Sequence, residues 1–233
     1  SVKHYRKTRK QLDELAVDDG KEPIHPQYVA RLLDELAASD AVFTADVGSP
    51  VIWASRYLSM HGDRRLLGSF AHGSMANAMP QALGAQAADR SRQVIALAGD
   101  GGLAMLMGDL LSIKQNKLPI KIVVFNNSSL NFVELEMKAA GIVNFATDLE
   151  NPNFAAVAES LGITGIRVEK GADLRGAVET MVASDGPVLL DVVTAREELS
   201  MPPAITIAQA KGFTVWALRT VLSGRGDELL DLA

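Results

Sequence analysis

The stretch Val94–Gly102, VIALAGDGG, joins a short run of apolar residues to a cluster of glycines around one carboxylate. The apolar run has the length of a strand that is buried on both faces. Asp100 follows at the point where that strand would end, and Gly101 and Gly102 let the backbone approach a ligand closely. This arrangement is typical of a site that holds a hard metal ion or a phosphate.

A second apolar run, Ile120–Phe125, ends in Asn126 and Asn127. Because the carboxyl ends of parallel strands meet at one edge of a sheet, we expect Asp100 and Asn127 to lie together. Carboxylate and carboxamide oxygens suit Mg²⁺ bound to a diphosphate, and backbone carbonyls of residues 128–130 could add a third ligand. A helix expected from Leu103 would present free N–H groups to the phosphates.

The chain from Pro26 to Val193 alternates between helix and strand patterns. We expect helices at 26–38, 51–58, 75–88, 103–115, 154–161 and 174–183, and strands at 41–45, 66–69, 94–98, 120–125, 165–168 and 188–193. The 75–88 helix should be buried. This alternation predicts an α/β fold in which helices cover both faces of a parallel sheet. The segment Asp46–Gly48 would then share the rim of the sheet with Asp100 and Asn127.

The composition excludes several classes of protein. The chain has 233 residues, a net charge of −5 and no cysteine, so disulfides and thiolate metal sites are excluded and general nucleic-acid affinity is not expected. Its hydrophobic fraction of 48% is typical of a globular domain with a sizeable core. We find no secretory signal and no apolar run long enough to span a bilayer.

The two ends of the chain differ from the rest. Residues 2–16 have a charged, helical pattern, and residues 18–23 have the pattern of a linker. Lys211–Leu222 has a helical pattern that is apolar around most of its circumference. Such a helix needs a cover, which the subunit core, a partner or lipid could provide.

The segment Gly99–Asn127 resembles the metal and diphosphate signature of the thiamine diphosphate-dependent decarboxylase and carboligase superfamily. The resemblance implies that Asp100, Asn127 and the carbonyl of Ser129 are metal ligands. His72–Pro80, HGSMANAMP, resembles the loop that binds the aminopyrimidine of the cofactor. There the Gly73 carbonyl would accept a hydrogen bond from the 4′-amino group, and Met75 would hold the cofactor in its bent shape. We interpret His72 as a surface or packing residue.

Within this superfamily, residues 24–28, 73–82, 103–109, 162–170 and the end of the chain resemble the bacterial pyruvate:quinone oxidoreductase (pyruvate oxidase) family. That implies a three-layer α/β/α fold with a parallel sheet and a helical C-terminal tail. Residues 24–197 would be the pyrophosphate-binding domain, and 1–23 the connection from an FAD domain outside this chain. Residues 198–233 would be a tail that covers the active site at rest and binds lipid on activation.

The resemblance also implies functional residues. Phe132 corresponds to an aromatic that assists electron transfer to FAD, although a loop aromatic packed on a neighbour is the alternative. Asn131 stands where the family leads us to expect glycine. The residues implied to contact the cofactor are Gly73, Ser74, Met75, Asp100, Gly101, Gly102, Asn127, Ser128, Ser129, Leu130, Asn131, Phe132 and Val133.

The family implies a peripheral enzyme on the inner, cytoplasmic face of the cell membrane, assembled as a dimer of dimers, with a site completed between two subunits. It uses thiamine diphosphate, Mg²⁺ and FAD to oxidise pyruvate to acetate and CO₂, and it passes electrons to a membrane quinone. The glutamate that activates the cofactor belongs to a pyrimidine-binding domain, so this chain alone should be inactive. The alternatives are an acetolactate synthase, an oxygen-dependent pyruvate oxidase or a non-catalytic domain of the same fold.

Overall fold

A computed structural model describes residues 2–20, 22–196, 198 and 206–224. The chain forms two compact units. The first comprises Ser1–Asn127 and Asn151–Ala195, and the second comprises Ser128–Glu150 and Arg196–Ala233. Parts of the expected linker (residues 1 and 21) and of the expected tail (197, 199–205 and 225–233) lie outside the described residues.

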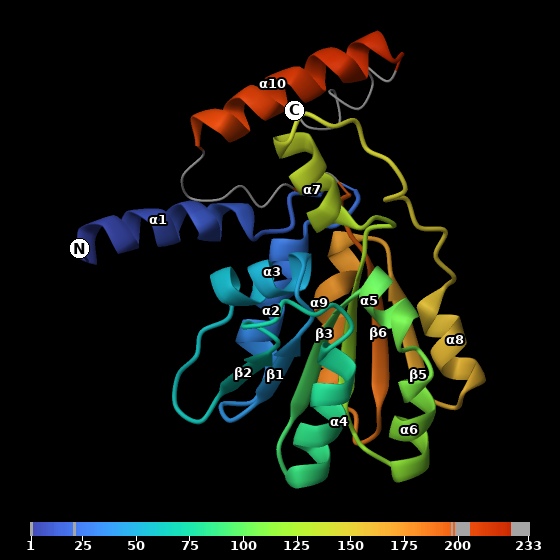
Figure 1. Ribbon diagram of the computed structural model, residues 1–233. Coiled ribbons are helices and arrows are strands. Elements are labelled where there is room, and N and C mark those ends of the chain that lie inside the picture. The colour runs from blue at the N-terminus through green and yellow to red at the C-terminus, as the bar shows by residue number, and fades with distance from the viewer. Residues whose placement is uncertain (1, 21, 197, 199–205, 225–233) are drawn as a thin grey trace. The chain divides into compact units, whose positions relative to one another are not determined.

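The first unit is built on a parallel sheet (Figure 1). Within the described residues the sheet has six strands in the order β2-β1-β3-β4-β6-β5, and every pairing is parallel. The strands are β1 (Val42–Ala45), β2 (Arg65–Gly68), β3 (Val94–Gly99), β4 (Lys121–Asn126), β5 (Thr164–Val168) and β6 (Val188–Val193). Each expected strand is present to within one or two residues, so the predicted parallel α/β fold is confirmed.

Helices connect these strands. They are α1 (Val2–Leu15), α2 (Pro26–Leu36), α3 (Ser49–Tyr57), α4 (Ala78–Ala88), α5 (Asp100–Met105), α6 (Asp109–Asn116), α8 (Phe154–Ser160) and α9 (Gly171–Ala183). The expected charged helix at the start of the chain is therefore present as α1. Pro26 lies in the first turn of α2, where its missing N–H costs no hydrogen bond.

Two separate apolar cores cover the two faces of the sheet. Alternate residues of β3 point to opposite faces, so that Ile95 and Leu97 pack with α2, α3 and α9. Val94, Ala96 and Ala98 pack on the other face with α4, α6 and α8. The result is the three-layer α/β/α arrangement, in which the carboxyl ends of β1, β3 and β4 lie side by side at one rim.

Three helix predictions were wrong in extent. The helix expected at 174–183 begins earlier, at Gly171. The helix expected from Met75 begins at Ala78, because Gly73 and Ala76 have positive φ angles of 76° and 58°, which a right-handed helix does not contain. Met75 is 36% exposed, and α4 buries one face rather than its whole surface. The helix expected at 103–115 is two helices, α5 and α6, separated at Leu106–Gly108.

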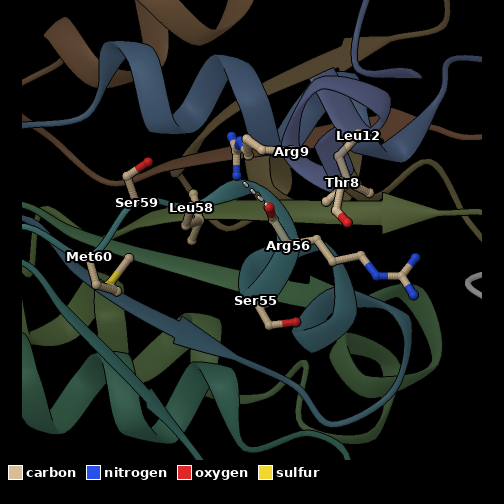
Figure 2. A pocket seen from close by; sticks show the side chains of 8 residues that line it. All are labelled: Thr8, Arg9, Leu12, Ser55, Arg56, Leu58, Ser59 and Met60. Carbon is tan, nitrogen blue, oxygen red and sulfur yellow. Dashed lines mark hydrogen bonds between the residues drawn. The ribbon is translucent and has the colours of Figure 1, made fainter. Parts of the chain in front are cut away.

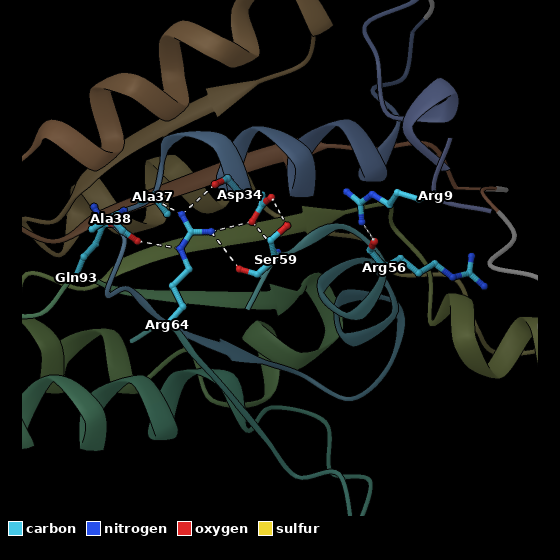
Figure 3. A network of polar contacts seen from close by, with 8 residues as sticks. All are labelled: Arg9, Asp34, Ala37, Ala38, Arg56, Ser59, Arg64 and Gln93. Carbon is cyan, nitrogen blue, oxygen red and sulfur yellow. Dashed lines mark hydrogen bonds and ion pairs between the residues drawn. The ribbon is translucent and has the colours of Figure 1, made fainter. Parts of the chain in front are cut away.

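A buried arginine network fixes the amino-terminal side of the sheet (Figure 3). The Arg64 guanidinium donates to Asp34 Oδ1 at 2.8 Å and to the carbonyls of Asp34, Ala37 and Ala38. Asp34 also accepts hydrogen bonds from the N–H and hydroxyl of Ser59. The network therefore joins the end of α2 to the segment between α3 and β2.

The second unit contains α7 (Asn131–Ala139) and α10 (Ile207–Leu222), which pack against each other. A Cβ on Gly212 would lie 1.7 Å from the Ala139 carbonyl oxygen, so glycine permits this close contact. Trp216 is buried, whereas Leu218, Val221 and Leu222 are exposed. The expected apolar helix is present, and among the described residues one face of it is covered by protein. Within the described residues, no helix is both long and apolar enough to cross a membrane.

Candidate functional site

Asp100 lies at the junction of β3 and α5, where its carboxylate is 3% exposed. Oδ1 accepts a hydrogen bond from the Gly101 N–H at 2.8 Å. Oδ2 accepts one from the backbone N–H of Asn127 at 3.1 Å, which links the ends of β3 and β4. The structure therefore brings Asp100 and Asn127 together, as the sequence predicts.

Asn151 completes this arrangement. Its Nδ2 donates to Asp100 Oδ2 at 2.8 Å and to Asn126 Oδ1 at 2.9 Å. The Asn126 amide donates in turn to Asp191 Oδ1, at 2.9 Å. Asp191 is held by the Phe154 N–H and by Arg167. Asp100 is thus fixed in position by a continuous set of hydrogen bonds that reaches β6.

Gly102 is buried beside Asp100, and a Cβ on Gly102 would overlap the Asp46 carboxylate. The helix that follows begins at Asp100 rather than at Leu103, so Asp100 and both glycines belong to its first turn. At Gly102 the missing side chain makes room for the Asp46 carboxylate. Backbone contact of Gly101 and Gly102 with a phosphate stays a prediction.

The segment Gly73–Met75 lies in the turn before α4. Gly73 has a positive φ of 76° and open space where a Cβ would be, and Met75 presents an exposed thioether side chain. Ser74 is half-buried, and its carbonyl accepts a hydrogen bond from Val47 N–H. An exposed apolar residue beside an open backbone segment suits the ring of a bound cofactor. His72 is exposed, which agrees with its interpretation as a surface residue.

The remaining predicted cofactor contacts belong to the second unit. Ser128 has a positive φ of 56°, and Ser129 is buried and pairs with Asp148 in an isolated β-bridge. Leu130 donates its N–H to the Thr147 carbonyl at 2.8 Å, immediately before α7. The role of the Ser129 carbonyl as a metal ligand stays a prediction.

Asn131, Phe132 and Val133 form the start of α7, a helix that we did not predict. Asn131 has a helical backbone here, so glycine is not required at this position, and its Nδ2 donates to the Arg196 carbonyl. Phe132 is half-buried and Val133 is exposed. Phe132 is therefore part of a helix rather than of a loop, and its part in electron transfer is untested.

Glu134 and Lys138 are buried in α7, 2.9 Å apart. Ser129 Oγ donates to Glu134 Oε2 at 2.6 Å, and Arg196 also contacts this oxygen. Burial alone would raise the pKa of Glu134, but hydrogen bonds from Ser129 and Lys138, with the charges of Lys138 and Arg196, hold the pKa below its usual value. This ionic cluster anchors Ser129 to α7.

A surface hollow of about 460 Å³ lies elsewhere in the first unit, between α1 and α3 (Figure 2). Arg9 crosses it and donates to the Arg56 carbonyl at 2.8 Å. None of the predicted site residues lines this hollow, whose lining is Thr8, Arg9, Leu12, Ser55, Arg56, Leu58, Ser59 and Met60.

Sequence reasoning missed two residues of the site. Asn151 follows Glu150 in a polar run that also holds Asn153, the N-cap of α8, and that run was the available signal. Asp46 was placed on the rim but was given no function, although its carboxylate is buried between the two predicted cofactor segments. Among the described residues, no three His, Cys, Asp or Glu side chains gather as metal ligands.

The rim of this parallel sheet carries Asp100 and Asn127 beside a glycine-rich turn. This arrangement is typical of domains that bind a cofactor through its diphosphate. Residues 46–192 match the family model described as "Thiamine pyrophosphate enzyme, C-terminal TPP binding domain". The chain belongs to this family, whose cofactor, thiamine pyrophosphate, is the same molecule as thiamine diphosphate. The hard oxygens at Asp100 and the open backbone at Gly73 are compatible with this cofactor and its metal ion.

Similar proteins of known sequence include "Putative thiamine pyrophosphate-containing protein YdaP" of Bacillus subtilis. The two are 37% identical over 210 residues, which is 90% of this chain and 36% of that protein. Acetolactate synthase 2 of Zea mays is 33% identical over 190 residues, 78% of this chain and 30% of the synthase. Acetolactate synthase of Arabidopsis thaliana is 34% identical over 190 residues, 78% and 28% respectively. The chain spans about a third of the length of these relatives.

Proposed function

We propose that the natural full-length protein oxidatively decarboxylates pyruvate and transfers the electrons to a membrane quinone. Pyruvate, water and quinone would give acetate, CO₂ and quinol. The supporting observation is the Asp100–Asn127 contact at the rim, together with the resemblance of residues 24–28, 73–82 and 162–170 to the pyruvate:quinone oxidoreductases. Membership of the thiamine pyrophosphate enzyme family is compatible with this function but does not distinguish it from others.

In this proposal Asp100 and Asn127 hold Mg²⁺ and the diphosphate, with the Ser129 carbonyl as a further ligand. When bound, thiamine diphosphate would supply a carbon nucleophile for the keto group of pyruvate, and FAD would supply the two-electron acceptor. Gly73 and Ser74 orient the aminopyrimidine through their backbone, and Met75 supports its ring. Phe132 assists the passage of electrons toward FAD.

The C-terminal segment supports a membrane-associated role. Leu218, Val221 and Leu222 expose apolar surface on α10, and an amphipathic surface of this kind can bind at a lipid interface. Phospholipid is thus the proposed ligand of this segment, and the inner face of the cell membrane is the proposed location. Homo-oligomerisation as a dimer of dimers would bring in the pyrimidine-binding domain that completes the site.

Acetolactate synthesis is the second candidate function. It is favoured by the identities of 33% and 34% to two plant acetolactate synthases. The same Asp100 and Asn127 would hold the cofactor, but the carbon unit from pyruvate would join a second pyruvate instead of being oxidised. Oxygen-dependent pyruvate oxidase activity is a third candidate function of the same site.

One assay separates these activities. The natural full-length protein, supplied with thiamine diphosphate, Mg²⁺, FAD and pyruvate, is tested with a soluble quinone analogue, with and without phospholipid vesicles. Quinone-dependent acetate formation, increased by the vesicles, supports the proposal. Acetolactate without quinone reduction supports the synthase, and hydrogen peroxide formation supports the oxidase. Absence of all three products, with cofactor bound, would contradict every form of the proposal.

A further inference from the structure

Asp46 follows β1 and is 2% exposed, yet it carries a carboxylate. Its backbone N–H donates to the Leu97 carbonyl of β3 at 3.0 Å, which fixes the residue at the rim. The carboxylate oxygens face two different segments. Oδ1 accepts a hydrogen bond from the Ala78 N–H at 2.8 Å, and Oδ2 accepts one from the Gly99 N–H at 3.2 Å.

The hydrogen bond between Asp46 and the Ala78 N–H caps α4 with a side chain that is distant in sequence. Asn77 occupies the N-cap position of α4 but makes no capping hydrogen bond, because its side chain bonds Ser69 N–H and the Ser74 carbonyl instead. The N–H groups of Asn77 and Ala78 at the start of α4 are directed at Asp46, whose negative charge suits the positive end of the helix dipole. Asp46 therefore holds the end of the turn that contains Gly73, Ser74 and Met75.

Further bonds from β1 and from the residues directly after it hold the same turn. Thr44 Oγ1 donates to the Ala78 carbonyl at 2.8 Å, and the Val47 N–H donates to the Ser74 carbonyl at 3.3 Å. Ala76 adopts a positive φ of 58°, an uncommon conformation for alanine that the surrounding contacts must impose. The backbone of the predicted aminopyrimidine segment is thus tied to β1 and to the residues directly after it.

The second contact reaches the predicted diphosphate turn. A Cβ at Gly102 would lie 2.1 Å from Asp46 Oδ2 and 3.3 Å from the Ala76 N–H nitrogen. The glycine at position 102 leaves the space that the Asp46 carboxylate occupies. The two segments expected to bind opposite ends of the cofactor therefore meet at one buried side chain.

Burying a carboxylate costs free energy, which disfavours this group for a purely structural hydrogen bond. Burial raises the pKa of Asp46 to about 6, against the lowering effect of the Ala78, Gly99 and Asn77 N–H groups. Charged groups that remain buried despite this cost often serve a functional geometry.

We propose that Asp46 is a positioning residue whose carboxylate holds the Gly73–Ala78 segment and the Gly99–Gly102 turn in the spacing that thiamine diphosphate requires. This inference rests on the proposed function. Asp46 acts through the two backbone segments and is not itself a catalytic residue.

The test compares Asp46→Asn with Asp34→Asn in the natural full-length protein. Asparagine keeps the size of Asp46 but turns a donor toward one of the two N–H groups. Thiamine diphosphate affinity, measured by calorimetry at saturating Mg²⁺, should fall at least tenfold in Asp46→Asn. Backbone amides of residues 76–78 and 99–101 should exchange with deuterium faster. Asp34→Asn should lower thermal stability through the network in Figure 3 and leave the affinity within twofold.

An affinity within twofold of wild type in folded Asp46→Asn would overturn the inference, as would an equal loss in Asp34→Asn. If Asp46→Asn does not fold, Thr44→Val replaces it, because this change removes only the hydroxyl bond to Ala78. A threefold or greater loss of affinity then supports the inference, and unchanged affinity overturns it. Failure of the wild-type protein to bind thiamine diphosphate would instead refute the proposed function itself.

Discussion

Asp100 Oδ2 and the backbone N–H of Asn127 are joined by a hydrogen bond of 3.1 Å, across 27 residues of sequence. The bond connects the carboxyl ends of β3 and β4, so the Asp100 carboxylate and the backbone of Asn127 lie together on the rim. It also fixes the backbone at Asn127, where the first of the two segments of the first unit ends. The position of Asp100 thus depends on the register of the sheet and on the residues that bond its carboxylate.

Asn151→Ala should weaken binding of Mg²⁺ and thiamine diphosphate about tenfold, or about 1.4 kcal/mol. The change removes the amide that donates to Asp100 Oδ2 and to Asn126 Oδ1. Calorimetric titration of the full-length protein measures the effect. Asn153→Ala is the matched control, since it removes the N-cap of α8, costs about 1 kcal/mol of stability and should leave cofactor affinity unchanged. Equal effects of the two variants would contradict the role given to Asn151.

Arg64→Met should lower the free energy of unfolding by about 3 kcal/mol or more, because it leaves the Asp34 carboxylate without its buried cation. Several backbone carbonyls also lose their donor. Denaturant unfolding measures the loss. Adding Asp34→Asn to Arg64→Met should recover part of it, and a double variant less stable than Arg64→Met would count against the network.

The pKa of Asp46 predicts a dependence of stability on pH. Burial raises this pKa from 3.8 to about 6, so the folded protein binds the proton more tightly than the unfolded chain. Stability should therefore fall as the pH rises from about 4 to about 6 and then level off, with Asp46 contributing about 3 kcal/mol. Unfolding of wild type and Asp46→Asn across this range isolates the contribution. Identical slopes in the two proteins would refute it.

Lys138→Met should destabilise α7 by roughly 3 kcal/mol, since Glu134 would lose the ammonium group 2.9 Å from its carboxylate. Lys138 Nζ also lies 5.1 Å from the centre of the Trp216 ring, so the packing of α10 on α7 should loosen as well. Hydrogen–deuterium exchange across residues 131–139 reports the change. Adding Glu134→Gln should restore part of the protection, and unchanged exchange in Lys138→Met would contradict this prediction.

Much of the fold follows from local sequence. Short apolar runs such as Val94–Ala98 predict buried strands, and their alternation with helical patterns predicts the parallel sheet. The start of α4 did not follow, because Ala76 has a positive φ and Ala78 bonds to Thr44 and Asp46, which are distant in sequence. Helix α7 was also missed. From the sequence we interpret its residues as cofactor contacts, although Phe132–Ala139 also has an amphipathic helical pattern.

The sequence predicted the part of the candidate site in which a carboxylate or carboxamide residue follows an apolar strand, as at Asp100 and Asn127. Asn151 could not be placed because no strand precedes it, and its position depends on the chain folding back beside Asn126. The function of Asp46 depends on two segments, around Ala78 and Gly99, that meet only in three dimensions.

The central claim is that Asp100 and Asn127 hold the metal and diphosphate of thiamine diphosphate. The most direct measurement is calorimetric binding of thiamine diphosphate to the full-length protein, with Mg²⁺ present or removed by chelation, for wild type, Asp100→Asn and Asn127→Ala. The account predicts Mg²⁺-dependent binding by wild type and a loss of at least a hundredfold in Asp100→Asn, with a smaller loss in Asn127→Ala. Equal affinity of wild type and a folded Asp100→Asn, or binding that does not require Mg²⁺, would contradict it.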